Sequence, residues 1–151
     1  MQIITTLAPP LSELSALAVE CFSEYPWNEH WELEEMIRYF SRFKNAGASF
    51  VIAYEQEQIV AFGIALRLSN YWDAKGIVNG HPEHSSFYVS ALATHRDYRR
   101  HGLCTEIMKI FVDQAESSAL DAVYVRTRHD NTAAIGIFEQ LGFKKCGEQD
   151  A

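Results

Sequence analysis

The sequence lacks several features that would place it in a specialised class of protein. No hydrophobic run approaches the roughly 18 residues of a membrane-spanning helix, so no membrane partner is predicted. Only three cysteines occur, and their odd number and scattered positions indicate reduced thiols rather than a disulfide framework. The first ten residues carry no charged segment ahead of a long apolar stretch, so no signal peptide is expected. These absences together predict a soluble, cytoplasmic protein.

Two common phosphate-binding motifs are also absent. Neither Gly-x-Gly-x-x-Gly nor a Walker lysine occurs, which disfavours a binder of dinucleotides or ATP. What remains is an ordinary globular composition, with 48% hydrophobic and 22% charged residues. A length of 151 residues is typical of one domain with a core of its own. We therefore predict a single domain over residues 1–151.

Positive charge is missing from the N-terminal quarter of the chain. Residues 1–37 contain seven glutamates and no lysine or arginine, and the whole chain has a net charge of −7. Two interpretations remain open: the glutamates lie on solvated helix faces, or they form a field that attracts a cationic amine. Duplex nucleic acid is not a predicted partner, because binding it requires a broad basic face.

A basic turn stands out against this acidic background. Residues 95–102 separate an apolar run, Phe87–Thr94, from a helical pattern, Leu103–Ala115. The first turn of a helix has unpaired N–H groups and partial positive charge, which suit an anion. A phosphate group is the simplest ligand for a positive turn in an acidic protein. The charged residues that give this turn about +2 by simple count are Arg96, Arg99, Arg100 and Asp97.

Hydrophobic periodicity divides the chain into alternating short elements. Strands are predicted over residues 2–6, 50–54, 59–68, 87–94, 122–127 and 143–148. Helices are predicted over 11–22, from a cap at Asn28 to Asn45 with Leu33 in its buried stripe, over 103–115, and from a cap at Asn131 to Gly142. Gly63, inside a strand, predicts a bulge or a close backbone approach. This order predicts an α/β (α+β) protein with a mixed sheet flanked by helices.

Two sequence blocks resemble a known family. Leu92–Cys104 is similar to the acetyl-CoA signature of the GNAT N-acetyltransferase superfamily, Gln/Arg-x-x-Gly-x-Gly/Ala after a strand. Arg99 and Gly102 fit that pattern, and Cys104 departs from it. Asn131–Phe143 resembles the family's Asn-x-x-Ala…Tyr…Leu-Gly-Phe helix, with Phe138 in place of the tyrosine. The resemblance covers roughly residues 87–147, whereas the first half matches only in its order of elements.

The resemblance implies a GNAT-like acyl-CoA N-acyltransferase fold. That fold has one more C-terminal strand than this sequence supplies. Three explanations stay open: the strand is dispensed with, the chain is a shortened member, or a second chain covers the edge in a homodimer, since an uncovered edge invites pairing.

The resemblance also implies acetyl-CoA as co-substrate. Gly102 would let the backbone approach the diphosphate, and the arginines would add charge-assisted bonds. Main-chain groups of the preceding strand would hold the pantetheine arm, and a backbone N–H near Leu92 would face the developing oxyanion. Cys104 would either pack or act as an oxidisable thiol. The predicted cofactor-binding residues are Leu92, Ala93, Thr94, Arg99, Arg100, His101, Gly102, Leu103, Cys104, Thr105, Asn131 and Phe138.

The residues that could transfer a proton each have two possible roles. Tyr88 stands where family members with a carboxylate base carry it, but a phenol of pKa ~10 is a poor base, so the alternative is that Tyr88 binds substrate. His84, in a polar loop, is either solvated or a water-relayed base. No metal is predicted there, because Pro82 disrupts helical ligand spacing. Phe138 has no hydroxyl to act as an acid and is expected to pack against the cofactor arm.

Several aromatic residues fall in segments that border the acceptor site in the resembled family. Each belongs either to the core or to the wall of the ligand site. Trp72 is the preferred contact, because a cationic amine would lie on its ring face. The predicted substrate-binding residues are Trp27, Trp72 and Tyr88.

The resemblance therefore implies an N-acetyltransferase. We expect direct transfer of acetyl from acetyl-CoA to a primary amine, either a small cationic amine or a peptide amine, in a ternary complex. The alternative is a non-catalytic CoA-binding sensor or regulatory module, which the departures at Tyr88 and Phe138 keep open. A missing base does not exclude activity, because holding amine and thioester together can supply much of the catalysis.

Overall fold

A mixed sheet organises the computed structural model, which describes residues 1–73 and 85–146. The strands are hydrogen-bonded in sequence order, and only the last pair, β4 and β5, is parallel. The mixed α/β architecture predicted from the sequence is thus confirmed. The strands are β1 (Gln2–Thr6), β2 (Ser49–Glu55), β3 (Gln58–Arg67), β4 (Ser86–Thr94) and β5 (Ala122–Val125).

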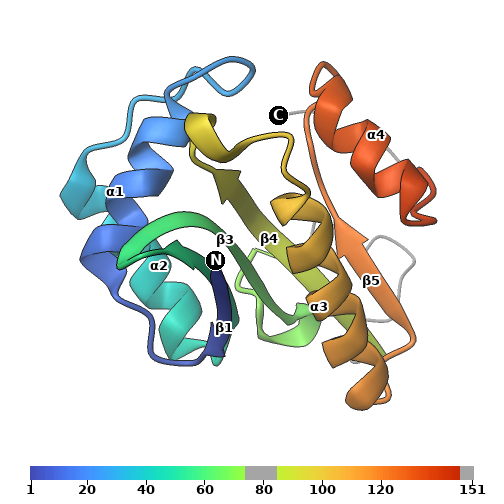
Figure 1. Ribbon diagram of the computed structural model, residues 1–151. Coiled ribbons are helices and arrows are strands. Elements are labelled where there is room, and N and C mark those ends of the chain that lie inside the picture. Colours follow the sequence, from blue (N-terminus) through green and yellow to red (C-terminus); the bar gives the residue numbers. More distant parts are fainter. Residues whose placement is uncertain (74–84, 147–151) are drawn as a thin grey trace.

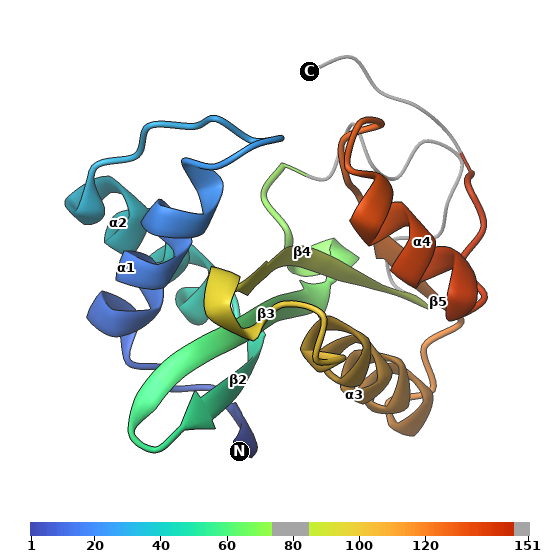
Figure 2. The ribbon, with the colours of Figure 1, turned by 45° about the horizontal axis from the view of Figure 1, so that its top comes forward.

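Helices cover both faces of this sheet (Figures 1 and 2). One face packs against α1 and α2, and the other packs against α3 with α4 beside it. No helix within the described residues is long and apolar enough to cross a membrane. The helices are α1 (Leu11–Phe22), α2 (Leu33–Asn45), α3 (Leu103–Ser117) and α4 (Thr132–Gln140), with short 3₁₀ turns η1 (Leu68–Asn70) and η4 (Arg96–Tyr98).

Two hydrophobic clusters lie on opposite faces of the sheet. Phe50 of β2 belongs to the cluster under α1 and α2, whereas its neighbour Val51 belongs to the cluster under α3. Strands buried on both faces are expected to read as continuous apolar runs, and β3 is buried from Ile59 to Leu66. The β2–β3 hairpin is therefore the centre of the core and supports the elements on either side.

The start of α2 differs from the sequence prediction. Asn28 does not cap this helix; it has a positive φ of 50° in the preceding connection. The helix begins at Leu33, and its first turn is closed where the Glu32 N–H donates to the Glu35 carboxylate at 3.1 Å. Leu33 is 44% exposed, so its assignment to the buried stripe is also wrong. A first-turn position turned away from the sheet explains that exposure.

Gly63 on β3 confirms the close backbone approach, one of the two alternatives expected there, while the bulge lies nearby on β4. A Cβ at this position would lie 2.6 Å from Phe111 and 2.7 Å from Ile107, so α3 approaches the strand closely here. The register also shifts one residue later: Ile64 pairs with Ala91 and Ala65 with Val89, which leaves Ser90 of β4 as an extra residue. The Ser90 hydroxyl donates to the Ile64 carbonyl at 3.2 Å. This bulge bends β4 at mid-length.

The C-terminal part departs from the predicted strands. β5 ends at Val125 rather than at Thr127, and residues 143–146 form no strand. Instead the Phe143 N–H donates to the Phe138 carbonyl at 2.9 Å, after Gly142 has turned the chain at a φ of 91°. Positions 147–148 of the predicted strand lie outside the described residues. Within the part described, β5 is an edge strand.

Candidate cofactor and acceptor site

The second half of β4 has an open edge. The parallel pairing with β5 runs from Ser86 to Val89, where Val89 meets Val125, while β4 itself continues to Thr94. Figure 1 shows the two strands diverging toward η4 and α4. The bulge at Ser90 and the short length of β5 cause this divergence. Backbone groups of residues 90–94 that point away from β3 therefore have no strand partner among the described residues, which suits an extended ligand arm.

The residues predicted to bind the pantetheine arm lie on this edge, but the carbonyl of one of them is already hydrogen-bonded. Leu92 and Ala93 pair with β3 on their other side. The Thr94 carbonyl already accepts from Arg99 Nε at 3.0 Å and from the Cys21 thiol at 3.5 Å. Its oxygen is thus used to anchor the basic turn to the strand.

The basic turn is shaped by its backbone. His95 Nδ1 accepts the Asp97 N–H at 3.1 Å, which starts η4. Arg100 and Gly102 then take positive φ angles of 65° and 79°, and α3 begins at Leu103. No atom lies within 4 Å of a Cβ built on Gly102, so open space adjoins it. The N–H groups of residues 103–105 have no partner inside the helix, and they and the space make a cradle for an anion.

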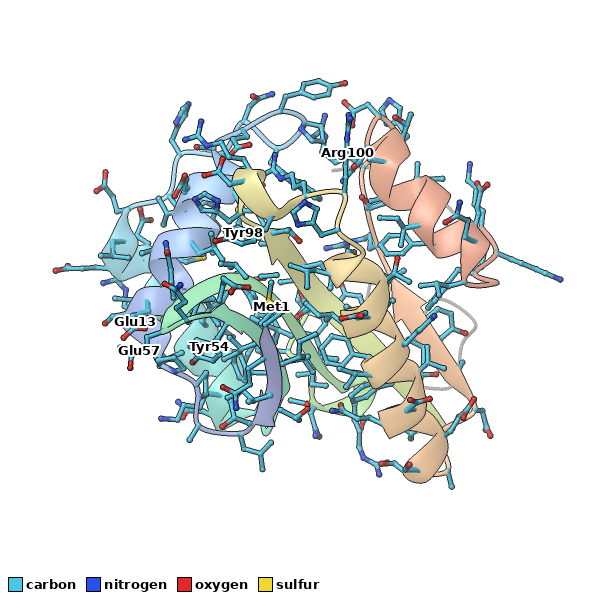
Figure 3. The ribbon with its side chains drawn as sticks, in the orientation of Figure 1. Met1, Glu13, Tyr54, Glu57, Tyr98 and Arg100 are labelled. Carbon is cyan, nitrogen blue, oxygen red and sulfur yellow. The ribbon has the colours of Figure 1, made fainter. Side chains whose placement is uncertain are left out.

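Two of the three arginines in the turn form ion pairs with glutamates of α1 and the segment just after it. Arg99 Nη1 lies 2.9 Å from a Glu24 carboxylate oxygen, and Arg96 Nη2 lies 3.4 Å from Glu20. Glu20 of α1 and Glu24, two residues past its end, therefore balance the positive turn, which neither interpretation from the sequence anticipated. Arg100 has no ion pair within the described residues, and Figure 3 shows it between the turn and α4 in that view. Arg100 and the backbone are what remain available for a phosphate.

Residues around the cradle support it by packing. His101 is exposed and lies edge-on to Tyr98, with ring centroids 6.4 Å apart. Burial raises the pKa of the Cys104 thiol to about 11, which favours packing over the interpretation as an oxidisable thiol. Leu103 is buried in the cluster under α3, and Thr105 is half-buried on the same first turn. The side chains thus fix the helix start and leave its amides to the ligand.

The two predicted residues of α4 have clear structural roles. Asn131 Oδ1 accepts the Ala134 N–H at 3.3 Å, which confirms the cap. Phe138 is 7% exposed and packs against Phe143 with ring centroids 5.9 Å apart. Contact of either residue with the cofactor stays a prediction.

Tyr88 lies on the opposite side of β4 from α3, in the cluster under α1 and α2. It is 3% exposed, and its ring centroid is 5.1 Å from that of Tyr71. Burial raises the pKa of Tyr88 to about 12, although the neighbouring Arg126 guanidinium opposes the shift. A raised pKa makes the Tyr88 phenol a poorer general base, so of its two predicted roles the substrate contact is favoured.

The ring face expected to receive a substrate cation is already covered. Arg42 Cζ lies 4.2 Å from the Trp72 ring centroid, so that face carries a cation of the protein itself. Trp72 is 37% exposed and packs on Tyr71 and Phe43 at 5.0 and 4.5 Å. Arg42 thus already occupies one face of the Trp72 ring, and contact of Trp72 with a substrate stays a prediction.

Two further residues were predicted to take part in substrate binding or catalysis, Trp27 and His84. Trp27 packs edge-on against Phe22 at 6.0 Å, at the end of α1. His84 lies outside the described residues. Sequence reasoning missed Arg42 and Arg126, although the register could have indicated the second: Tyr88 pairs with Tyr124, and Arg126 two residues later falls on the same face.

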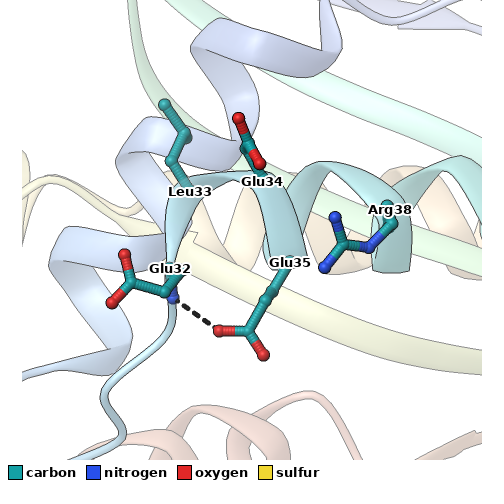
Figure 4. Close-up of a pocket in the computed structure, with 5 residues that line it drawn as sticks. All are labelled: Glu32, Leu33, Glu34, Glu35 and Arg38. Atoms are coloured by element: carbon teal, nitrogen blue, oxygen red, sulfur yellow. Dashed lines mark hydrogen bonds between the residues drawn. The ribbon is translucent and has the colours of Figure 1, made fainter.

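Surface hollows lie away from this region. One of about 460 Å³ is formed by the first turns of α2, and Figure 4 shows its lining side chains. Another of about 490 Å³ lies between the sheet and the C-terminal half of α3. Neither contains a residue of the basic turn, so the open edge of β4 is the better candidate. The first hollow is lined by Glu32, Leu33, Glu34, Glu35 and Arg38.

Comparison with known families agrees with this geometry. Residues 11–143 match the model of the acetyltransferase (GNAT) family. The chain belongs to this family. That assignment confirms the resemblance seen in the two sequence blocks.

Curated relatives match over short stretches. The chain is 30% identical over 56 residues to N-alpha-acetyltransferase 30 of Saccharomyces cerevisiae, covering 37% of this chain and 32% of the relative. It is 32% identical over 55 residues to the [ribosomal protein bS18]-alanine N-acetyltransferase of Escherichia coli K12, covering 36% and 37%. The matched part thus spans roughly a third of these relatives.

Solved structures match the whole fold. An aminoglycoside N-acetyltransferase in complex with CoA superposes with a TM-score of 0.77 at 14% identity, covering 99% of this chain and 91% of that one. The ribosomal-protein-alanine N-acetyltransferase of Brucella melitensis gives 0.74 at 16% identity, covering 97% and 86%. At these identities the likeness shows the fold, and it confirms the predicted architecture.

Proposed function

We propose that this protein transfers the acetyl group of acetyl-CoA directly to a primary amine in a ternary complex. The observation that carries the proposal is the arrangement of two features in sequence: the open edge of β4 ends at Thr94, and the basic turn that follows it ends in the cradle at Gly102. Acetyl-CoA would supply the acetyl group as a thioester. Membership of the family and the CoA bound in a neighbour of the same fold support this choice of co-substrate.

The chain's own groups divide the binding work. The amides of residues 103–105 and the Arg100 guanidinium would bind the diphosphate, because oriented N–H donors and a cation suit an anion. Main-chain groups of Leu92 and Ala93 would orient the arm along β4, and an N–H near Leu92 would stabilise the negative charge that develops on the carbonyl oxygen. Arg99 is engaged by Glu24, so it would shape the turn rather than bind phosphate.

Proton handling follows from Tyr88. With a pKa raised to about 12, its phenol is a hydrogen-bond donor at neutral pH, and it would orient the acceptor rather than deprotonate it. The acceptor amine must then lose its proton to solvent or to a group such as His84. Positioning of amine and thioester would provide most of the rate enhancement.

The proposed acceptor is a primary amine. The curated relatives are named as an N-alpha-acetyltransferase and a ribosomal-protein-alanine N-acetyltransferase, and a fold neighbour as an aminoglycoside N-acetyltransferase. The cytoplasmic location, the single domain over residues 1–151 and a homodimer that covers β5 stay predictions.

A non-catalytic CoA-binding module is the second candidate. Two observations favour it: Phe138 lacks a hydroxyl, and burial keeps the Tyr88 phenol protonated. In such a module, the same cradle would bind the cofactor as a signal.

Turnover and binding measured together separate the two candidates. Calorimetry with coenzyme A tests the cradle, and release of free thiol from acetyl-CoA tests transfer across a panel of primary amines. Binding with amine-dependent thiol release supports the transferase. Binding with no release for any amine supports the module, and the absence of binding contradicts both.

A further inference from the structure

A buried hydroxyl lies just past the end of β5, close to the point where β4 and β5 separate. The Thr127 Oγ1 atom is covered from solvent and has no hydrogen-bond partner among the described residues, although the residue as a whole is half-buried. Buried hydroxyls in proteins are nearly always hydrogen-bonded, because leaving one unpaired costs free energy. The same state is found for Ser15 on α1 and Ser49 at the start of β2, but neither belongs to β4 or β5. Thr127 therefore calls for a partner at the fork between these two strands.

The Thr127 side chain falls on the face of the sheet that α3 and α4 cover. Side chains along β5 alternate between the faces, since Val125 packs in the cluster under α3 and Tyr124 packs in the cluster under α1 and α2. Arg126 continues this alternation, because its guanidinium acts on Tyr88 in the cluster under α1 and α2. The next position, Thr127, thus returns to the face of α3, whose first turn forms the cradle.

Thr127 is also level with the proposed oxyanion donor. It lies two residues beyond Val125, where the parallel pairing ends. Two residues beyond the same pair on β4 is Ala91, and the bulge at Ser90 shifts this level toward Leu92. In the proposed function, an N–H near Leu92 stabilises the carbonyl oxygen of the thioester. The thioester sulfur is bonded to the same carbon as that oxygen, so it would arrive at the level of Thr127.

A hydroxyl at this level suits the leaving group of the reaction. When the amine attacks, the C–S bond breaks and its electron pair goes to sulfur, which becomes a thiolate. The cluster that adjoins this point consists of apolar side chains, among which a charge is costly unless a donor points at it. A threonine hydroxyl donates one hydrogen bond and keeps its own proton. Solvent then takes the proton that the amine loses and returns one to the thiolate.

On the basis of the proposed transfer, we propose that the Thr127 hydroxyl donates a hydrogen bond to the sulfur of acetyl-CoA and of the coenzyme A that leaves. This bond supplies the partner that the buried hydroxyl lacks. The N–H near Leu92 and the Thr127 hydroxyl then stabilise the two negative charges of the reaction, one on oxygen and one on sulfur. Phe138, which packs in the same cluster, has no hydroxyl for this purpose.

The pKa of the bound coenzyme A thiol tests this bond without turnover. A thiolate absorbs ultraviolet light that a thiol does not, so a pH titration of the complex gives this pKa, after subtraction of the same titration of the protein alone. A donor to the sulfur favours the thiolate and lowers the pKa. Thr127→Val should therefore raise the pKa of the bound thiol by about one unit, a tenfold change, because hydrogen bonds to charged groups are among the stronger ones.

Matched variants assign the effect to the hydroxyl at the fork. Thr127→Ser keeps a hydroxyl and should keep most of the lowered pKa. Ser49→Ala removes another buried hydroxyl on β2, which β3 separates from β4, and it should leave the pKa of the bound thiol unchanged. Thr127→Val should melt at no lower temperature than wild type, because valine has nearly the same shape and needs no hydrogen-bond partner. Its kcat for transfer should fall by about tenfold.

The outcomes separate this inference from the proposed function. A pKa of the bound thiol that is equal in wild type and in folded Thr127→Val, or one that rises as much in Ser49→Ala, overturns the inference and leaves the transferase intact. A raised pKa in Thr127→Val alone, with no thiol release by wild type for any amine, supports the hydrogen bond and contradicts the transfer. A raised pKa together with slower release supports both.

Discussion

The basic turn follows the end of β4, whereas an aromatic row packs beside one face of the sheet, and the two are built differently. The row consists of Arg42, Trp72, Tyr71, Tyr88 and Arg126. The turn is one continuous segment, residues 95–105, and its shape comes from two positive φ angles and a helix start. The row combines side chains from α2, from the segment after η1, from β4 and from the segment after β5. In the proposed function, cofactor recognition would thus be a local property of the backbone, whereas acceptor recognition would depend on the assembled fold.

A negative charge at Gly102, in the basic turn, should have the largest effect on coenzyme A binding. Gly102→Asp places a carboxylate where the diphosphate is proposed to bind, and it should lower coenzyme A affinity by about a hundredfold or more. Gly102→Asn is the control, because asparagine has nearly the same shape and tolerates positive φ. Calorimetry measures both. Equal loss in the two variants would mean that shape, not charge, is responsible.

Packing beneath the turn gives the next largest effect. Gly63→Ala adds a methyl group within 2.7 Å of α3 side chains and should destabilise the fold by about 1–3 kcal/mol. Gly136→Ala in α4 meets no atom within 4 Å and should instead stabilise the protein by about 0.5–1 kcal/mol. Chemical denaturation checks the pair. An unchanged midpoint for Gly63→Ala would show that α3 can shift without cost.

Tyr88→Phe tests the aromatic row, the second of the two regions compared. Turnover should fall by about tenfold while coenzyme A affinity changes little, because the phenol is proposed to contact the acceptor rather than the cofactor. The phenol stays protonated below its pKa of about 12, so the pH midpoint of activity should be the same in wild type and variant. Kinetics from pH 6 to 9 provide the test. A midpoint that disappears in Tyr88→Phe would restore the tyrosine as the base.

The ion pairs that Glu24 and Glu20 form with the basic turn should have the smallest effect. Glu24→Gln removes the partner of Arg99, but both side chains are well exposed, at 30% and 43%, so solvent screening limits the loss to less than about 1 kcal/mol. Coenzyme A affinity should then fall by no more than a fewfold, and less still in Glu20→Gln. Losses as large as in Gly102→Asp would mean that side chains hold the turn, and the contrast between the two regions would fail.

The same contrast explains what the sequence could predict. The basic turn, the Asn131 cap and the turn at Gly142 were predictable because each depends on a few consecutive residues. The Asn28 cap was wrong because a pair of glutamates further along offers the helix start a competing closure. A local sequence pattern does not show which of two possible capping groups closes the first turn of a helix.

Contacts between distant segments were not predictable. The partners of Arg96 and Arg99 depend on how α1 packs against β4, and the contact of Arg42 with Trp72 depends on how α2 packs beside η1. Sequence spacing alone gives no distance between such elements. Only the register of β4 and β5, once known, places Arg126 beside Tyr88.

Amide chemical shifts during a titration with coenzyme A test the central claim most directly. If the diphosphate binds at the start of α3 and the arm lies along β4, the largest shifts will fall on the amides of residues 101–105 and 91–94. Small shifts there, with the largest changes on β1 or at the first turns of α2, would contradict the account.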